Sequence, residues 1–198
     1  MNKTVIFFGG FLLNTEKSIK IISRIEGTLI SDLRSIKIIA EERNNSDLLK
    51  NKYPGGLNFT IFISSLIACE TLGYFIKSNS DAGRSKENIT NFISSDYFEG
   101  SAFKKDNYLD LLVSLRTNLA HVFGMTDLGL ENINKELVLC VGDAKQPEVK
   151  RENGLVKLNG IKFLDLVVRG FDSIKKEVTS NSGNSKIINI ISEKADKI

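Results

Sequence analysis

The chain has 198 residues, a length that suits one domain with peripheral additions better than two domains. Hydrophobic residues make up 41% of it and charged residues 26%, a balance that excludes a fully disordered chain. The net charge of +3 comes from 27 basic and 24 acidic residues spread along the chain, so binding to nucleic acid would need a local basic patch.

The chain begins with an apolar run. "VIFFGGFLL" follows a lysine, as in a signal peptide, but two glycines interrupt the run and no A-x-A-like cleavage site follows it. A membrane-spanning helix needs ~20 residues, which is more than this run provides. We therefore expect a strand or a core-packing segment over residues 4–13, and no contact with a membrane.

Helical periodicity dominates the next two thirds of the chain. Isoleucine and leucine recur at helical spacing over 15–45, which predicts a first long helix that bends near Gly27. Residues 59–78 are apolar almost all round, as expected of a central helix that is buried on several sides. "KENITNFISSDYF" predicts a shorter helix after a polar loop.

Residues 106–123 predict another amphipathic helix, with Asp106 as N-cap and Gly124 as the stop signal. Five residues form its buried stripe by spacing, namely Tyr108, Leu112, Leu115, Leu119 and Val122. Thr117, Asn118 and His121, the single histidine of the chain, fall on the opposite face, and Arg116 falls on the flank.

The period changes after this helix. "KELVLCVGD" and "NGLVKLNG" are short apolar runs separated by a polar segment, which predicts a β-hairpin over 136–158. A closing helix follows over 160–178, and 179–198 reads as a flexible linker and a short C-terminal helix. The predicted fold is mainly α-helical, with residues 1–178 as a single domain and one small β-hairpin.

Two cysteines, Cys69 and Cys140, lie in apolar segments and lack the spacing of a metal site or a disulfide framework. They suit small buried side chains in a reducing, cytoplasmic compartment. One histidine and no cysteine pair leave zinc without ligands, so we expect no metal and no cofactor.

Glu70 interrupts the apolar helix over 59–78. An unpaired carboxylate in such a helix is costly, so Glu70 needs a cationic or hydrogen-bonding partner. Arg116 is the candidate, either as a buried structural pair or as the contact that orients a working guanidinium.

Three segments, "ACETLGYF", "FISSDYF" and "LVSLRTNLAHVFG", followed by the hairpin and the closing helix, resemble bacterial HEPN-like proteins over roughly residues 55–178. The R-x4-H spacing of Arg116 and His121 matches the motif of HEPN domains, many of which are metal-independent ribonucleases of toxin and defence systems. The resemblance implies a HEPN-like helical bundle, a homodimer that brings two such motifs to one cleft, and RNA, an antitoxin or another protein as partner. Two positions depart from the family pattern, because Thr117 stands where Asn, Asp or His is usual, and Phe123 where some members carry tyrosine.

The chemistry of these residue types fits RNA cleavage without a metal. A histidine with an ordinary pKa of about 6.5 can move a proton at neutral pH, and a guanidinium can hold the phosphate as negative charge develops. His121 would transfer the proton and Arg116 would stabilise the phosphate, with Thr117, Asn118 and Glu70 in support. One helix separates positions 116 and 121 by about 140°, so convergence requires a second copy of the helix.

A purely structural interpretation of the histidine, the arginine and the basic residues of the hairpin remains open. A histidine on the polar side of a helix is often only solvated, and a flanking arginine often pairs with a carboxylate. The alternative function is therefore a non-catalytic HEPN-like dimer that binds RNA, nucleotide or a protein partner. Lys150, Arg151 and Lys157, on the predicted hairpin, are either solvated or in contact with an RNA backbone.

Overall fold

The structure is a computed structural model, and it describes residues 4–52, 57–100, 102–121, 136–143, 145–153, 155–180 and 185–197. For residues 4–12, 50, 106–107, 117–121 and 136–138 the backbone alone is described. Helices make up most of the described chain, which confirms the prediction of a mainly α-helical protein. The α-helices are α1 (Thr4–Ile25), α2 (Ser31–Asn45), α3 (Asp47–Lys52), α4 (Asn58–Ile76), α5 (Ser85–Ile93), α6 (Asp106–His121), α7 (Gly160–Ser180) and α8 (Lys186–Ala195).

The first helical region begins earlier than predicted. Residues 4–13 belong to α1, so the strand, one of the two alternatives expected here, was wrong, because the apolar run continues directly into the helical period that follows it. Core packing, the other alternative, depends on the side chains of residues 4–12, which lie outside the described part of the chain. A five-residue π-helix, Glu26–Ile30, joins α1 to α2. It contains Gly27, near which the sequence predicted a bend, and π-helical turns of this kind are a known cause of bending in long helices.

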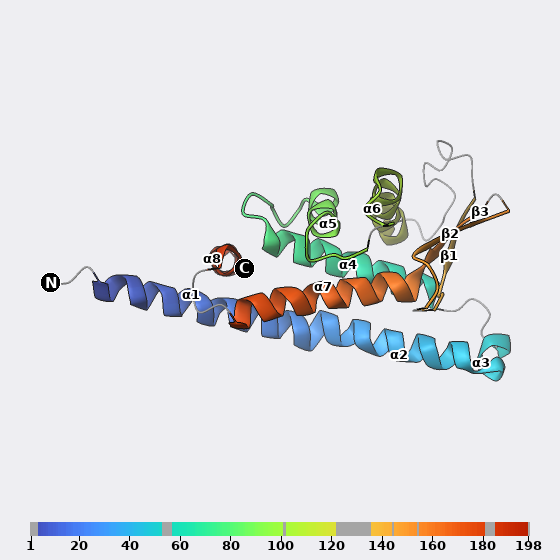
Figure 1. The fold of residues 1–198 in the computed structure, drawn as a ribbon, viewed down its shortest axis with the longest axis horizontal. Coiled ribbons are helices and arrows are strands. Elements are labelled where there is room, and N and C mark those ends of the chain that lie inside the picture. The colour runs from blue at the N-terminus through green and yellow to red at the C-terminus, as the bar shows by residue number, and fades with distance from the viewer. Residues whose placement is uncertain are drawn as a thin grey trace.

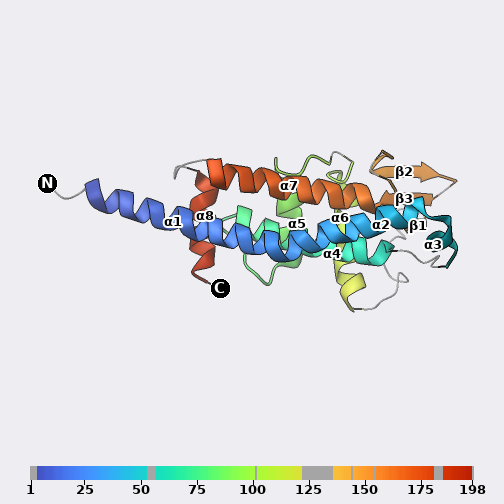
Figure 2. The same ribbon diagram turned by 90° about the horizontal axis from the view of Figure 1, so that it is seen from below.

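Figure 1 shows α1 and α2 as one long rod, with α7 running beside it and α5 and α6 stacked on the other side of α4. In Figure 2, α4 and α7 both lie against this rod, which makes α4 the central helix that the sequence predicted. The aromatic part of the core lies between α4, α5 and α7, where the ring of Phe163 contacts those of Phe62 and Phe98, and all three are fully buried. A long apolar helix thus has neighbours on several sides.

Close backbone contact holds α5 against α4. A Cβ atom added at Gly73 would lie 1.7 Å from the carbonyl oxygen of Asn88, so only glycine permits this approach. The side-chain amide of Asn88, itself fully buried, donates to the carbonyl of Asp81 over 2.9 Å and ties the α4–α5 loop to α5. The start of α5 is therefore fixed relative to α4.

The region predicted as a β-hairpin over 136–158 is a mixed sheet of three strands, β1 (Glu136–Cys140), β2 (Val149–Glu152) and β3 (Leu155–Asn159). The two apolar runs, β1 and β3, pair in parallel, so the predicted antiparallel pairing between them was wrong. The antiparallel partner of β3 is β2, which lies in the polar segment that we interpreted as a loop. An edge strand exposed on both faces lacks the alternation that reveals a strand in sequence.

The short C-terminal helix is present as α8, and it is part of the core. Ile187, Ile188 and Ile191 are buried, and α8 crosses α1 (Figure 2). Its last turn carries Lys194, which is 2% exposed, donates to the Oγ of Ser80 over 2.9 Å and lies 4.1 Å from the ring centre of Tyr74. Burial lowers the pKa of this lysine below its ordinary value.

Candidate functional site

The predicted contact between Glu70 and Arg116 is confirmed. Nε of Arg116 on α6 donates to Oε2 of Glu70 on α4 over 3.0 Å. The two side chains are 22% and 18% exposed, so the pair lies near the surface with most of each side chain shielded from water. A carboxylate in the most apolar helix thus has the cationic partner that its position requires.

Ser85 is a third member of this cluster, and we did not predict it. Its hydroxyl donates to Oε1 of Glu70 over 2.5 Å, so each carboxylate oxygen accepts one hydrogen bond. Ser85 is the first residue of α5, which the contact at Gly73 holds against α4. Because both partners of Glu70 come from packed helices, the carboxylate holds Arg116 in place through Nε.

The α6 backbone carries position 121 five residues after Arg116 in the same helix. Tyr108, Leu112 and Leu115 of the predicted apolar stripe are buried, and Asp110 on the other face is exposed. Arg116 on the flank faces α4, which agrees with its predicted place. The side chains of Thr117, Asn118, Leu119 and His121, and the whole of Val122 and Phe123, lie outside the described residues.

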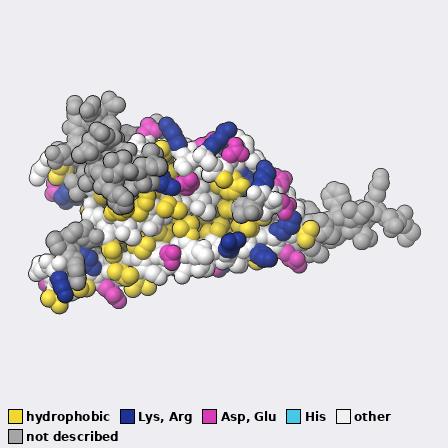
Figure 3. All heavy atoms as spheres, turned by 180° about the vertical axis from the view of Figure 1, so that it is seen from behind, with side chains coloured by type: hydrophobic (Ala, Val, Ile, Leu, Met, Phe, Trp, Pro, Cys, Tyr) yellow, Lys and Arg dark blue, Asp and Glu magenta, His cyan; other side chains and the backbone are white. Residues whose placement is uncertain are grey.

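Glu70 lies within a partly exposed apolar stripe on α4. Phe59, Ile63, Ile67 and Tyr74 share its side of the helix by spacing, and each is partly or largely exposed, with Ile67 at 38%. Figure 3 shows the molecule from behind, where hydrophobic side chains gather across the middle. We call these five residues, Glu70 included, the α4 stripe.

Among the helices that the structure describes, α4 alone is long and apolar enough to cross a membrane, and half of its most apolar window is buried inside the protein. A central helix of a folded core has the same length and composition, so this finding by itself does not indicate a membrane span.

The three basic residues suggested as RNA contacts do not share one face. Nζ of Lys150 and Nζ of Lys157 both lie 3.1 Å from Oε2 of Glu152, on one face of the sheet. Arg151, one residue from Lys150 on β2, donates instead to the Tyr108 hydroxyl over 2.8 Å, on the face toward α6. A single basic patch of all three residues is therefore not formed.

The cysteines differ in their environment. Cys69 is fully buried, as predicted, and burial raises the pKa of its thiol well above the ordinary value. Cys140 is partly exposed, and its Sγ lies 3.0 Å from the carbonyl oxygen of Leu158. In the part of the chain that the structure describes, no group of three or more His, Cys, Asp or Glu side chains is arranged to hold a metal ion.

Comparison with protein-family models, with curated proteins and with solved structures found no match. The resemblance to HEPN proteins thus rests on the residues quoted above.

Proposed function

We propose that this protein is a metal-independent endoribonuclease of HEPN type, acting in a toxin or antiviral-defence setting in the cytoplasm. His121 transfers protons at the 2′-hydroxyl or the leaving oxygen, and Arg116 stabilises the phosphate. Thr117 and Asn118 support the site from the same helix. The observation that carries the proposal is the held guanidinium, because Glu70 and Ser85 fix Arg116 at a partly exposed position beside the motif helix.

The atom of Arg116 that Glu70 contacts matters for the proposed chemistry. Glu70 contacts Nε, whereas the paired terminal nitrogens are the part of arginine that grips a phosphate with two parallel hydrogen bonds. A donor that is oriented before substrate arrives loses little freedom on binding, so it stabilises developing charge more effectively. Glu70 and Ser85 are thus positioning residues in this proposal.

The active form is proposed to be a symmetric homodimer. Five residues of helix separate Arg116 and His121 by about 140° around the axis and by about 7.5 Å along it, so one helix converges them poorly. Ile67 of α4, 38% exposed and one turn before Glu70, supports the dimer, because the same face of a second copy would cover it. Light scattering at micromolar concentration should give the mass of a dimer, and a strictly monomeric species would contradict the composite site.

The alternative is a non-catalytic HEPN-like dimer that binds RNA, nucleotide or a protein partner such as an antitoxin. The same ion pair favours it if the role of the pair is structural. Glu70 neutralises Arg116 at 3.0 Å, which is also what a purely structural pair between α4 and α6 would do. In that case the guanidinium is bound by the protein itself and holds no phosphate.

RNA cleavage separates the two candidates. Purified protein should cut single-stranded RNA in the presence of a chelator, and Arg116→Ala should reduce the rate by roughly 10²–10³-fold through lost charge stabilisation. Arg169→Ala is the matched control, since Arg169 forms an exposed pair with Glu99 on another surface. Intact RNA after incubation with the folded wild-type dimer would favour the binding module.

A further inference from the structure

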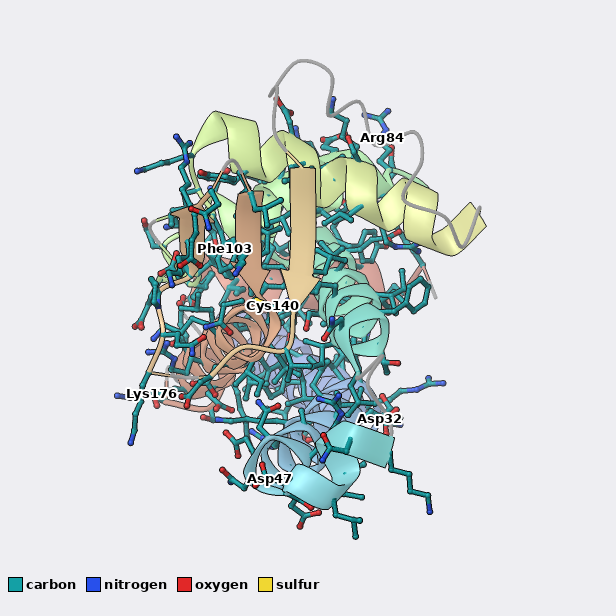
Figure 4. All side chains as sticks on the ribbon, turned by 90° about the vertical axis from the view of Figure 1, so that its right-hand side faces the viewer. Asp32, Asp47, Arg84, Phe103, Cys140 and Lys176 are labelled. Carbon is teal, nitrogen blue, oxygen red and sulfur yellow. The ribbon has the colours of Figure 1, made fainter. Side chains whose placement is uncertain are left out.

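The outer face of the sheet is polar and carries a hollow of about 610 Å³. Lys150, Lys157 and Cys140 contribute to its wall from the three strands. Asn44 near the end of α2 and the β1–β2 connection, including Asp143 and Gln146, close its other sides. In Figure 4, Cys140 lies at the end of β1, above α2 and α3.

This hollow is built by a buried side chain. Asn159 is 3% exposed, and its Nδ2 donates to the carbonyl of Asp143 over 2.7 Å, with longer contacts to those of Gln146 and Pro147. Gly142, at φ +70°, permits the tight approach, because a Cβ there would lie 2.1 Å from Oδ1 of Asn159. The side-chain amide of Asn44 fixes the same connection by donating to the carbonyl of Gly142 over 2.7 Å. The wall is therefore formed before any ligand binds.

Two lysines at the edge of the hollow share one carboxylate oxygen. Lys150 and Lys157 are directly opposite each other in the β2–β3 ladder, an arrangement that is destabilising for like charges. Glu152 lies between them, and both ammonium groups contact the same oxygen, Oε2, so one small anion can touch both. The charged residues that line the hollow are the two lysines and Asp143, and Glu152 balances the second lysine until a bound anion displaces it.

We propose that this hollow binds a phosphate monoester of nucleotide size, with the phosphate between Lys150 and Lys157. The hollow, about 610 Å³, lies within the usual range of small-ligand sites and is far larger than a phosphate ion requires. Asp143 and the side-chain amide of Gln146 supply hydrogen-bonding groups suited to the hydroxyls and the base of a ribonucleotide. The bound phosphate takes the place of Glu152 at the two ammonium groups.

The proposal is independent of the ribonuclease proposal. Arg151 contacts Tyr108 of α6 on one face of β2, and Lys150, the neighbouring residue, points to the opposite face. The hollow thus lies across the sheet from α6 and uses none of Arg116, His121 or Glu70. A protein without ribonuclease activity would keep this site.

Cys140 lies in the wall of the hollow, so the rate at which its thiol is labelled reports whether a ligand is bound there. The chain has two cysteines, and Cys69 is fully buried, so Cys140 should react with N-ethylmaleimide far faster in the folded protein. Burial raises the pKa of the Cys140 thiol, and Lys157 acts in the opposite direction, so each variant is compared with itself, with and without ligand. Modification of Cys69, followed by peptide mass spectrometry, reports any unfolding.

The probes are the four ribonucleoside 5′-monophosphates, the matching nucleosides and inorganic phosphate. At least one monophosphate should slow the labelling of Cys140, and its nucleoside should not. Lys150→Ala combined with Lys157→Ala should weaken the protection by roughly tenfold or more, because each lysine loses a charge-assisted contact. Lys176→Ala, at an exposed position away from the hollow (Figure 4), should leave the protection unchanged.

Glu152→Gln should change the affinity for the nucleotide in the opposite direction from the double lysine variant. The carboxylate competes with the phosphate for the lysines, so its neutralisation should increase the affinity measured by calorimetry. Equal labelling with and without every monophosphate, or equal protection in the double lysine variant, would overturn the proposal. Protection by inorganic phosphate as strong as that by the nucleotides would contradict a nucleotide-sized ligand.

Discussion

Glu70 on α4 accepts a hydrogen bond from Nε of Arg116 on α6 over 3.0 Å, although 46 positions separate the two residues in the chain. Ser85 completes the cluster at the other carboxylate oxygen. This contact joins the central helix to the helix that carries the R-x4-H motif. Through this contact the fold positions the arginine that the proposed reaction uses.

Glu70→Ala should lower the free energy of unfolding by about 1–3 kcal/mol, because it leaves a half-buried guanidinium and a serine hydroxyl without their acceptor. The measurement is urea denaturation at pH 7. Glu99→Ala, which breaks an exposed pair with Arg169, should cost at most about 1 kcal/mol. Equal losses in the two variants would mean that the Glu70 pair contributes no more than a solvated one.

Gly73→Ala should destabilise the protein by about 3 kcal/mol or more, because its Cβ would lie 1.7 Å from the Asn88 carbonyl and force α5 away from α4. Gly27→Ala is the matched control, since a Cβ at Gly27 meets no atom within 4 Å. There the loss of backbone freedom in the unfolded chain should stabilise the protein by about 0.4–1 kcal/mol. Thermal denaturation of both variants checks the pair, and a stable Gly73→Ala protein would refute the close packing.

Acid should weaken the contact between the first helical region and α7. Hydrogen bonding from Lys175, with Arg34 nearby, lowers the pKa of the Glu26 carboxyl below its ordinary value. A carboxyl whose folded pKa is lowered contributes stability above its unfolded pKa, about 4.3, and loses it as pH falls through the folded value. Urea titrations from pH 6 to pH 3 should thus show a smaller decrease for Glu26→Gln than for wild type. Identical decreases would contradict a stabilising role for this pair.

Much of the helical fold was predictable because periodicity and capping signals agree. Asp106 and the spacing of Tyr108, Leu112 and Leu115 located α6, and the apolar character of residues 58–76 identified the central helix. Glu70 was informative for a different reason. A carboxylate in such a helix demands a partner, and Arg116 on the flank of α6 was the residue that fitted.

The sheet was harder to predict, because pairing depends on distant packing rather than on local pattern. β1 and β3 are both apolar and short, and nothing within them distinguishes parallel from antiparallel pairing. β2 has the sequence of a polar loop, "VKRE", and becomes a strand because β3 offers an edge. Ser85 was missed for a similar reason, since a serine in a polar segment gives no sign that its hydroxyl meets Glu70.

The central claim, that the motif helix performs proton transfer on RNA, is tested most directly by the cleavage rate of His121→Ala relative to wild type. Both proteins should be assayed on single-stranded RNA with a chelator present, after circular dichroism and light scattering have shown equal folding and equal mass. The account predicts a rate reduced by roughly 10²–10⁴-fold, the usual contribution of a positioned acid or base. Equal rates in the two proteins, or no cleavage by wild type, would contradict it.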